Sequence, residues 1–247
     1  AFANLLTPEL YGKYKFVFSA VTVIMSISLS GVGIVITKSV AQGFEGAYIQ
    51  GFINTLKYSF VSIAGTICLG FYYVSQNDKE LAILILLAGI LTPLLQSLNL
   101  YGALLEGKKD FILSVKCQLI YTLVPTIFLV ATLFQTQNLL ILISVYFATN
   151  IVTNGILSLY SYRVHKPNRK INPYDTKFTA HLTVMGILSQ AVNQADKILV
   201  FHFLGAQQLA MYVVASAPPL QMNILQKGLK TIIYPKISVR SKDEIKK

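Results

Sequence analysis

The polar run from Gln190 to Leu204 stands out because it interrupts a region that is otherwise apolar. Gln190, Asn193 and Lys197 are spaced three and four residues apart, which places them on one face of a helix. Asp196 is next to Lys197, so a carboxylate and an ammonium can partly neutralise each other. A lone charge at bilayer depth costs roughly 2.5 to 3.5 kcal/mol on insertion scales, so it needs a partner, a cavity or a headgroup. The pattern therefore predicts a helix that faces the inside of a bundle.

The chemistry that such groups offer is hydrogen bonding and ion binding. The sequence has no nucleophile–base–acid set, no glycine-rich phosphate loop and no cluster with metal-ligand spacing. Cys68 and Cys117 both lie in apolar runs, which is typical of small core residues and not of a disulfide or a metal site. No soluble catalytic domain fits between the apolar segments. We therefore expect neither an enzyme nor a bound cofactor.

The elements that must position these side chains are long apolar helices. The chain has 247 residues, 54% hydrophobic and only 13% charged, whereas soluble domains carry about 25% charged residues. Seven segments approach the ~20 residues that cross a bilayer. The fold class expected is thus all-α, a polytopic transmembrane helix bundle. The seven predicted spans cover residues 14–37, 52–74, 81–104, 111–134, 139–160, 179–203 and 210–234.

Basic residues alternate between the two sides of these spans. One side, with the adjoining helix ends, holds Lys38, Lys57, Lys108, Lys109, Lys116, Arg163, Lys166, Arg169, Lys170, Lys177, Lys227, Lys230, Lys236, Arg240, Lys242, Lys246 and Lys247. The other side holds Lys13, Lys15, Lys79 and Lys197. The positive-inside rule places the first side in the cytoplasm, including the loop 161–178 and the C-terminal tail. The net charge of +11 therefore reflects membrane orientation and contact with lipids, and not nucleic-acid binding.

Two segments of the chain that lie 198 residues apart have similar sequences, and we call this similarity the internal echo. The segment from Leu6 to Tyr14 aligns with the segment from Leu204 to Tyr212, and each opens a span of the same direction. Such an echo is typical of transporters built from parallel repeats. The repeat predicts one further span before Ala1, and the absence of an initiator Met suggests a piece of a longer protein.

Residues 5–14, Leu-Leu-Thr-Pro-Glu-Leu-Tyr-Gly-Lys-Tyr, are followed by Ser-Gly-Val-Gly at 30–33. These motifs resemble the first external loop and second helix of polysaccharide flippases, the O-antigen type translocases of the multidrug/oligosaccharidyl-lipid/polysaccharide exporter superfamily. Thr7 stands where that family usually has Gly. Residues 195–199, 203–206 and 211–215 resemble the family's seventh and eighth helices.

The resemblance implies a transporter of 12–14 helices in two lobes, which moves undecaprenyl-diphosphate-linked oligosaccharide from the cytoplasmic to the outer leaflet. Residues 1–178 would then be most of the first six-helix lobe without its first helix, and residues 179–247 the start of the second. The implied setting is the cytoplasmic membrane. The implied partners are the lipid-linked oligosaccharide, membrane lipids, a proton or sodium ion for coupling, and a polysaccharide polymerase.

A diphosphate-sugar headgroup needs cations for its phosphates and amides or hydroxyls for its sugars. The substrate-binding candidates are Lys116, Asn150, Asn154, Gln190, Asn193 and Lys197. Gln96 and Asn99 are further amides in the cytoplasmic half of their span. Hydrogen bonding between helices is the alternative role for every amide, and snorkelling to headgroups is the alternative for Lys116. Asp196 is the candidate for ion coupling, with local pairing or capping as the alternative.

Three other functions compete with flipping. A cation-coupled drug or metabolite antiporter of the same superfamily would share the fold, but the Pro-Glu-x-Tyr-Gly motif beginning at Pro8 favours the flippase. A membrane O-antigen polymerase would carry a large charged loop, and the sequence between the spans has none. A membrane scaffold without transport activity is the third.

Overall fold

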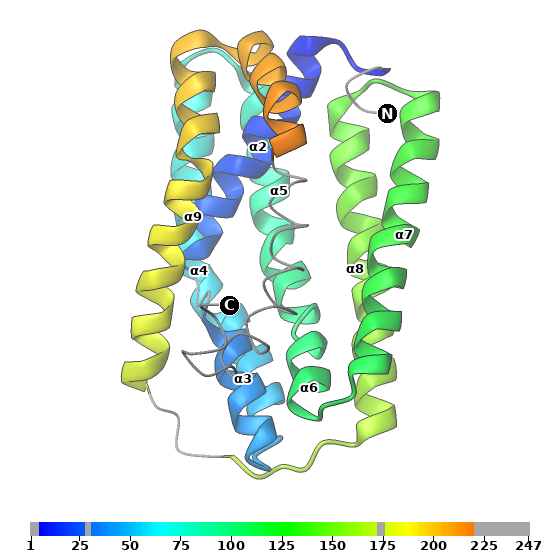
Figure 1. The fold of residues 1–247 in the computed structure, drawn as a ribbon. Coiled ribbons are helices and arrows are strands. Elements are labelled where there is room, and N and C mark those ends of the chain that lie inside the picture. Colours follow the sequence, from blue (N-terminus) through cyan, green and yellow to red (C-terminus); the bar gives the residue numbers. More distant parts are fainter. Residues whose placement is uncertain (1–4, 28–30, 172–175, 220–247) are drawn as a thin grey trace, which may run out of the picture.

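The computed structural model describes residues 5–27, 31–171 and 176–219, with the backbone alone for 176–180. Within these ranges the regular structure is helical (Figure 1). The helices are α2 (Pro8–Ser26), α3 (Val32–Ala41), α4 (Ala47–Ser75), α5 (Lys79–Leu98), α6 (Tyr101–Gly107), α7 (Phe111–Gln135), α8 (Leu139–His165) and α9 (Thr176–Leu204). Residues 206–219 form a further helical segment.

The connections alternate between the two ends of the bundle. The loops 42–46, 108–110 and 166–171 lie at the lower end in Figure 1, which we call the basic end. The connections 76–78, 136–138 and Gly205 lie at the opposite end. This arrangement is the up-and-down order that the charge pattern predicts. The helix axes are roughly parallel to one another, and successive spans alternate in direction, as expected of a polytopic membrane protein.

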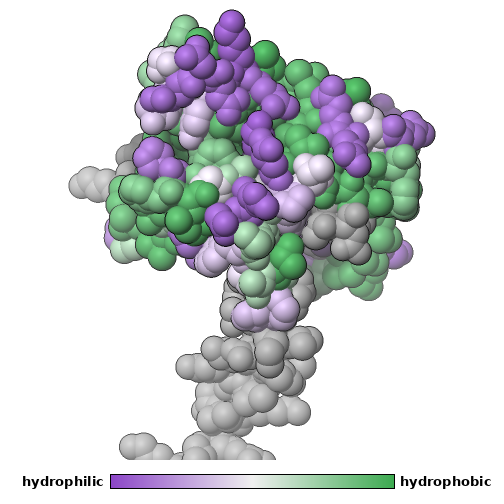
Figure 2. Space-filling view, turned by 90° about the horizontal axis from the view of Figure 1, so that it is seen from above, coloured by the Kyte–Doolittle hydropathy of each residue, from purple (hydrophilic) through white to green (hydrophobic). Residues whose placement is uncertain are grey.

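Large apolar side chains face outward, and small or polar ones face inward. On α4, Phe60 is 76% exposed, whereas Ser62 and Thr66 are fully buried. In the end-on view of Figure 2, hydrophilic residues gather over the loops, and hydrophobic residues form most of the flanks. A soluble protein would hide the apolar side chains, whereas a bilayer solvates them and leaves small residues to mediate helix packing. The bundle is therefore built to sit in a membrane.

The close contact of α4 and α5 illustrates this packing. An added Cβ on Gly89 would lie 2.1 Å from Cγ2 of Thr66, and one on Gly70 would lie 2.9 Å from Cγ of Leu86. Ser59 and Thr66 satisfy their hydroxyls on carbonyls of their own helix, at 2.5 and 2.9 Å. The glycines let the two backbones approach closely, and Ser59 and Thr66 keep their hydroxyls bonded within α4.

Two of the predicted spans are interrupted. The span predicted at 14–37 is divided between α2 and α3, with residues 28–30 outside the described residues. The span predicted at 81–104 is divided between α5 and α6 at Asn99 and Leu100. The halves pair with each other, α2 packing against α5 and α3 against α6. The interruptions were not foreseen, because hydropathy reports the surrounding medium and not the continuity of the backbone.

The other spans agree with the helices to within a few residues where they are described. Four helical stretches of the described chain are long and apolar enough to cross a membrane: Ala47–Ser75, Lys79–Gly107, Phe111–Gln135 and Leu139–His165. Helix α9 has 29 residues, which is also sufficient in length, but it carries the polar run. The span predicted at 210–234 is helical up to residue 219, and its remainder lies outside the described residues, as does the tail.

Glu45 connects three loops at the basic end through a hydrogen bond and an ion pair. Its Oε2 accepts the backbone N–H of Asn168 at 2.7 Å, and its Oε1 pairs with the ammonium of Lys108. Burial alone would raise the pKa of the Glu45 carboxyl, but the bonds from Lys108 and Asn168 outweigh burial and lower the pKa. The ionised carboxylate therefore holds the α3–α4, α6–α7 and α8–α9 connections in one arrangement.

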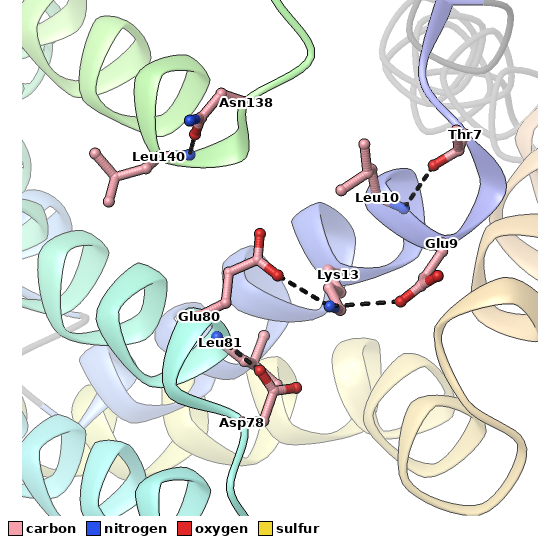
Figure 3. Close-up of polar contacts among 9 residues, drawn as sticks. All are labelled: Thr7, Glu9, Leu10, Lys13, Asp78, Glu80, Leu81, Asn138 and Leu140. Carbon is pink, nitrogen blue, oxygen red and sulfur yellow. Dashed lines mark hydrogen bonds and ion pairs between the residues drawn. The ribbon is translucent and has the colours of Figure 1, made fainter.

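Lys13 plays a similar part at the opposite end (Figure 3). Its Nζ lies 3.1 Å from Oε2 of Glu80 and 3.5 Å from Oε1 of Glu9, so it joins α2 to α5. Burial alone would lower the pKa of Lys13, but the nearby carboxylates outweigh burial and raise the pKa. Side-chain oxygens of Thr7, Asp78 and Asn138 cap the helices that begin at this end.

Candidate functional site

A polar cavity lies beside the interruptions of the two divided spans. Its volume is about 560 Å³, and it is walled by α2, α3, α4, α5, α6, α7 and α9. Ser26 and Val32 line it on either side of the α2–α3 interruption, and Asn99 and Leu100 line it at the α5–α6 interruption. Irregular backbone at membrane depth is tolerated where it borders a cavity of this kind.

The described lining is rich in neutral hydrogen-bonding groups. Four carboxamides, four hydroxyls and one carboxylate line the cavity: Gln96, Asn99, Gln118, Gln190, Thr22, Ser26, Thr37, Thr55 and Glu106. The described part of the lining contains no Lys or Arg. Amides and hydroxyls both donate and accept hydrogen bonds, as sugar hydroxyls do. This surface is thus suited to a hydroxylated neutral group, with Glu106 available as an additional acceptor.

The end of α5 aims two of these amides at the cavity. Pro93 lies buried within α5, and the Ser97 hydroxyl donates to the Pro93 carbonyl at 2.8 Å. The helix then stops at Leu98, which leaves Gln96 on its last turn and Asn99 at its C-cap. An added Cβ on Gly102 would have no atom within 4 Å, which agrees with its place in the cavity wall.

Helix α9 brings Gln190 to the same cavity by packing along α2 and α3. At the α3 N-cap, an added Cβ on Gly31 would lie 2.5 Å from Cβ of Leu182, so glycine permits the close approach. Further along, the rings of Phe16 and Phe201 stack with centroids 3.8 Å apart. Gln190 lies between these two contacts along α9 and lines the cavity. Of the six substrate-binding candidates predicted from the sequence, all of them described residues, Gln190 alone lines this cavity.

Asn150 and Asn154 are buried within the bundle instead. Asn150 is 3% exposed and Asn154 is fully buried. Each Nδ2 donates to the carbonyl one turn earlier in α8, that of Tyr146 and that of Asn150, both at 2.8 Å. Neither residue lines the cavity in this conformation. The hydrogen bonds stay within one helix, so they do not join two helices, which was the alternative expected for amides.

Lys197 and Asn193 form a local network near the opposite end. The Lys197 ammonium donates to Oε1 of Gln194 at 2.9 Å and to the Asn193 carbonyl at 3.1 Å. The Asn193 amide is exposed and lies 3.4 Å from the Ser189 hydroxyl. Gln190, Asn193 and Lys197 were predicted to share one functional face of the helix. Of the three, Gln190 alone lines the cavity.

Asp196 has a short hydrogen bond to the next helical segment. The Tyr212 hydroxyl donates to its Oδ2 at 2.5 Å, whereas the Lys197 ammonium is 3.9 Å from its Oδ1. Its Oδ1 accepts the backbone N–H of Lys197 at 2.9 Å, so its shortest side-chain contact is with Tyr212 and not with the Lys197 ammonium. The contact with Tyr212 joins α9 to that segment.

Lys116 is exposed on α7 and makes no hydrogen bond or ion pair with any described residue. It does not line the cavity, whereas Gln118 from the same helix does. The two are about 200° apart around a helix with 100° per residue. The polar cavity residues that the sequence predictions missed are Thr22, Ser26, Thr37, Thr55, Glu106 and Gln118. Glu106 and Gln118 could have been predicted most easily, because a carboxylate and an amide inside or beside apolar spans stand out in the sequence.

The comparisons with known proteins agree with this architecture. The family model described as "Polysaccharide biosynthesis protein" matches residues 1–238, nearly the whole sequence. No curated protein matches this chain, and no solved structure matches it. A polytopic helix bundle with a polar interior is in keeping with the membrane-associated family to which the match points. The chain belongs to the polysaccharide biosynthesis protein family, and it is a membrane protein.

Proposed function

We propose that this protein flips a lipid-linked oligosaccharide across the membrane during polysaccharide biosynthesis, from the cytoplasmic to the outer leaflet. The observation that carries the proposal is the cavity of about 560 Å³, polar inside, within a bundle whose flanks are apolar. A sugar headgroup loses its hydration in the hydrocarbon layer, and hydrogen bonds from amides and hydroxyls replace that water. Family membership supplies the biosynthetic context.

In this proposal, different groups of the protein bind different parts of the substrate. Gln96, Asn99 and Gln190 would bind sugar hydroxyls at the cavity. The diphosphate needs a cation from outside the described lining, and Lys116 and Lys197 remain the candidates. For Lys197 this requires release of Gln194 and of the Asn193 carbonyl, which the ammonium now contacts. Asp196, held by Tyr212, remains the candidate for coupling to a proton or sodium ion.

We place the basic end in the cytoplasm, because basic residues concentrate in loops of the cytoplasmic side. This puts the cluster of Glu45, Lys108 and Asn168 inside the cell and Lys13 outside it. The division into a first lobe at 1–178 and the start of a second at 179–247 belongs to the same proposal. In this account the protein transports and does not catalyse.

A flipping assay tests the function. The protein, expressed from its native reading frame, is reconstituted in liposomes with the undecaprenyl-diphosphate oligosaccharide of its host, and transfer between leaflets is followed with a membrane-impermeant sugar-cleaving enzyme. Protein-dependent transfer supports flipping. Transport of a cationic dye without transfer of the lipid would instead indicate the antiporter, and elongation of the oligosaccharide would indicate the polymerase.

A further inference from the structure

A second cavity, separate from the polar one, runs along the outside of α4 at the basic end. Its volume is also about 560 Å³, and it shares no lining residue with the polar cavity. Its α4 residues follow one helical stripe, and two residues of the α8–α9 connection close it. The lining consists of Gly46, Ile49, Gln50, Ile53, Asn54, Lys57, Arg169 and Ile171. We call this surface the α4 groove.

The wall supplied by the α8–α9 connection is anchored to the start of α4. The Gly46 N–H donates to the Lys170 carbonyl at 3.0 Å. An added Cβ on Gly46 would lie 2.9 Å from the Arg169 carbonyl oxygen, so the two backbones are in close contact. The Asn168 amide, which is bonded to Glu45 and to Gly43, fixes the same turn. Arg169 is therefore placed beside α4 by backbone contacts and not by its own side chain.

The α4 groove has unbalanced positive charge. Lys57 and Arg169 are exposed, and neither has an ion-pair partner among the described residues. The described lining contains no Asp or Glu. The Oε1 atom of Gln50 is buried and has no described hydrogen-bond partner. Two cations and an unused carboxamide thus border one concave surface.

The depth of Lys57 explains why an anion is required. Lys57 is eleven residues beyond Gly46 in α4, about 16 Å along the helix axis. Ile53, one turn before it, is 43% exposed on the same stripe, and Phe60 beyond it is 76% exposed, so this face meets hydrocarbon. An ammonium at this depth extends its side chain toward the headgroups and pairs with an anion there. Isoleucines flank the path that it takes.

We propose that the α4 groove binds an anionic phospholipid of the leaflet at the basic end. The phosphate lies with Arg169 at the mouth, Lys57 reaches it from below, and Gln50 and Asn54 hydrogen-bond to the polar headgroup. One acyl chain follows Ile49, Ile53 and Ile171. A free phosphate would match the cations but leave the apolar wall uncovered, whereas a phospholipid matches both. The site would set which lipids surround the bundle near its loop cluster, and it does not depend on the transported substrate.

Native mass spectrometry of the purified full-length protein tests the proposal, with phosphatidylglycerol titrated against phosphatidylcholine. Wild type should retain phosphatidylglycerol in preference to phosphatidylcholine. The double variant Lys57→Gln/Arg169→Gln should bind phosphatidylglycerol about 25-fold more weakly, which is about fivefold for each cation. The matched control is Lys109→Gln/Lys170→Gln, which removes two charges from the same end but none from the groove. It should bind nearly as wild type does.

Ile53→Trp provides a second variant that keeps both charges and fills the groove. It should reduce phosphatidylglycerol binding with a normal melting temperature, which separates loss of the site from misfolding. Equal binding by wild type and by both groove variants would overturn the proposal. Displacement of the lipid by inorganic phosphate at millimolar concentration would assign the site to free anions and also overturn it. A dimer that Ile53→Trp abolishes, without lipid adducts on the monomer, would assign the groove to a second copy instead.

Discussion

Gly12 of α2 lies directly against Ala206. A Cβ on Gly12 would be 1.8 Å from the Ala206 carbonyl oxygen and 2.5 Å from its carbonyl carbon. The two segments related by the internal echo, which begin at Leu6 and Leu204, therefore meet at the opposite end of the bundle. Leu6 and Leu209 are 5% and 0% exposed within one apolar cluster. The echo thus corresponds to a packed interface, and its two members are neighbours in space.

Gly12→Ala should destabilise the protein by about 1–3 kcal/mol, because a backbone carbonyl cannot yield to the added methyl group. Thermal unfolding of the purified protein and its level in membranes measure the effect. Gly155→Ala is the matched control, since an added Cβ there has no atom within 4 Å, and its melting temperature should not fall. Equal stability of the two variants would contradict the close contact.

Asn154→Leu should preserve both stability and flipping. The Asn154 side chain is fully buried, donates within its own helix, and leaves its Oδ1 without a described partner. Replacing such a group by an apolar one of similar volume is nearly neutral or stabilising. Thermal unfolding and surface-polysaccharide complementation measure the two outcomes. Loss of polysaccharide at normal membrane level would show that Asn154 borders the transport path in another conformation.

Glu45→Gln should loosen the basic end in a pH-dependent way. The pKa of Glu45 is lowered in the folded protein. Its contribution to stability is therefore fully present above the ordinary carboxyl pKa of about 4.5 and is lost as the pH falls through the lowered pKa. At pH 5 the wild type should melt above the variant, and the margin should shrink as the pH falls below about 4.5. A margin that grows as the pH falls below about 4.5 would contradict this linkage.

Cysteine labelling tests the orientation. In a variant whose Cys68 and Cys117 are replaced by alanine, Lys79→Cys at the opposite end should react with an impermeant maleimide on whole cells. Lys170→Cys at the basic end should react only after permeabilisation, because both positions are exposed but on different sides. The reverse pattern would place the basic end outside.

The helices were largely predictable, because long apolar runs report the membrane directly. The span predicted at 111–134 became α7, Phe111–Gln135, and the span at 139–160 lies within α8, Leu139–His165. The divided spans were not predictable in the same way. Asn99 and Leu100 do not lower the hydropathy enough to mark a break, and the neighbouring helices that stabilise it are distant in sequence.

The site was only partly predictable. Gln190 was identified by its type and spacing, and it lines the cavity. Asn150 and Asn154 were selected by the same criteria of residue type and helical spacing, but their side chains hydrogen-bond to carbonyls of their own helix. An amide in an apolar helix has the same sequence signature whether it faces a cavity, a neighbouring helix or its own backbone. The difference depends on the rotation of the helix in the bundle, which is set by glycine contacts such as that of Gly31 with Leu182.

The most direct test of the central claim is the flipping rate of Gln96→Leu/Gln190→Leu in proteoliposomes loaded with the lipid-linked oligosaccharide. Both amides line the polar cavity, and the loss of two hydrogen bonds to sugar hydroxyls should slow flipping about tenfold. Gln135→Leu/Gln208→Leu, which changes two exposed amides away from the cavity, should flip as wild type does. A slow cavity variant at normal protein level, beside a normal control, is the predicted result. Equal rates for the cavity variant and wild type would contradict the assignment of the cavity to the sugar headgroup.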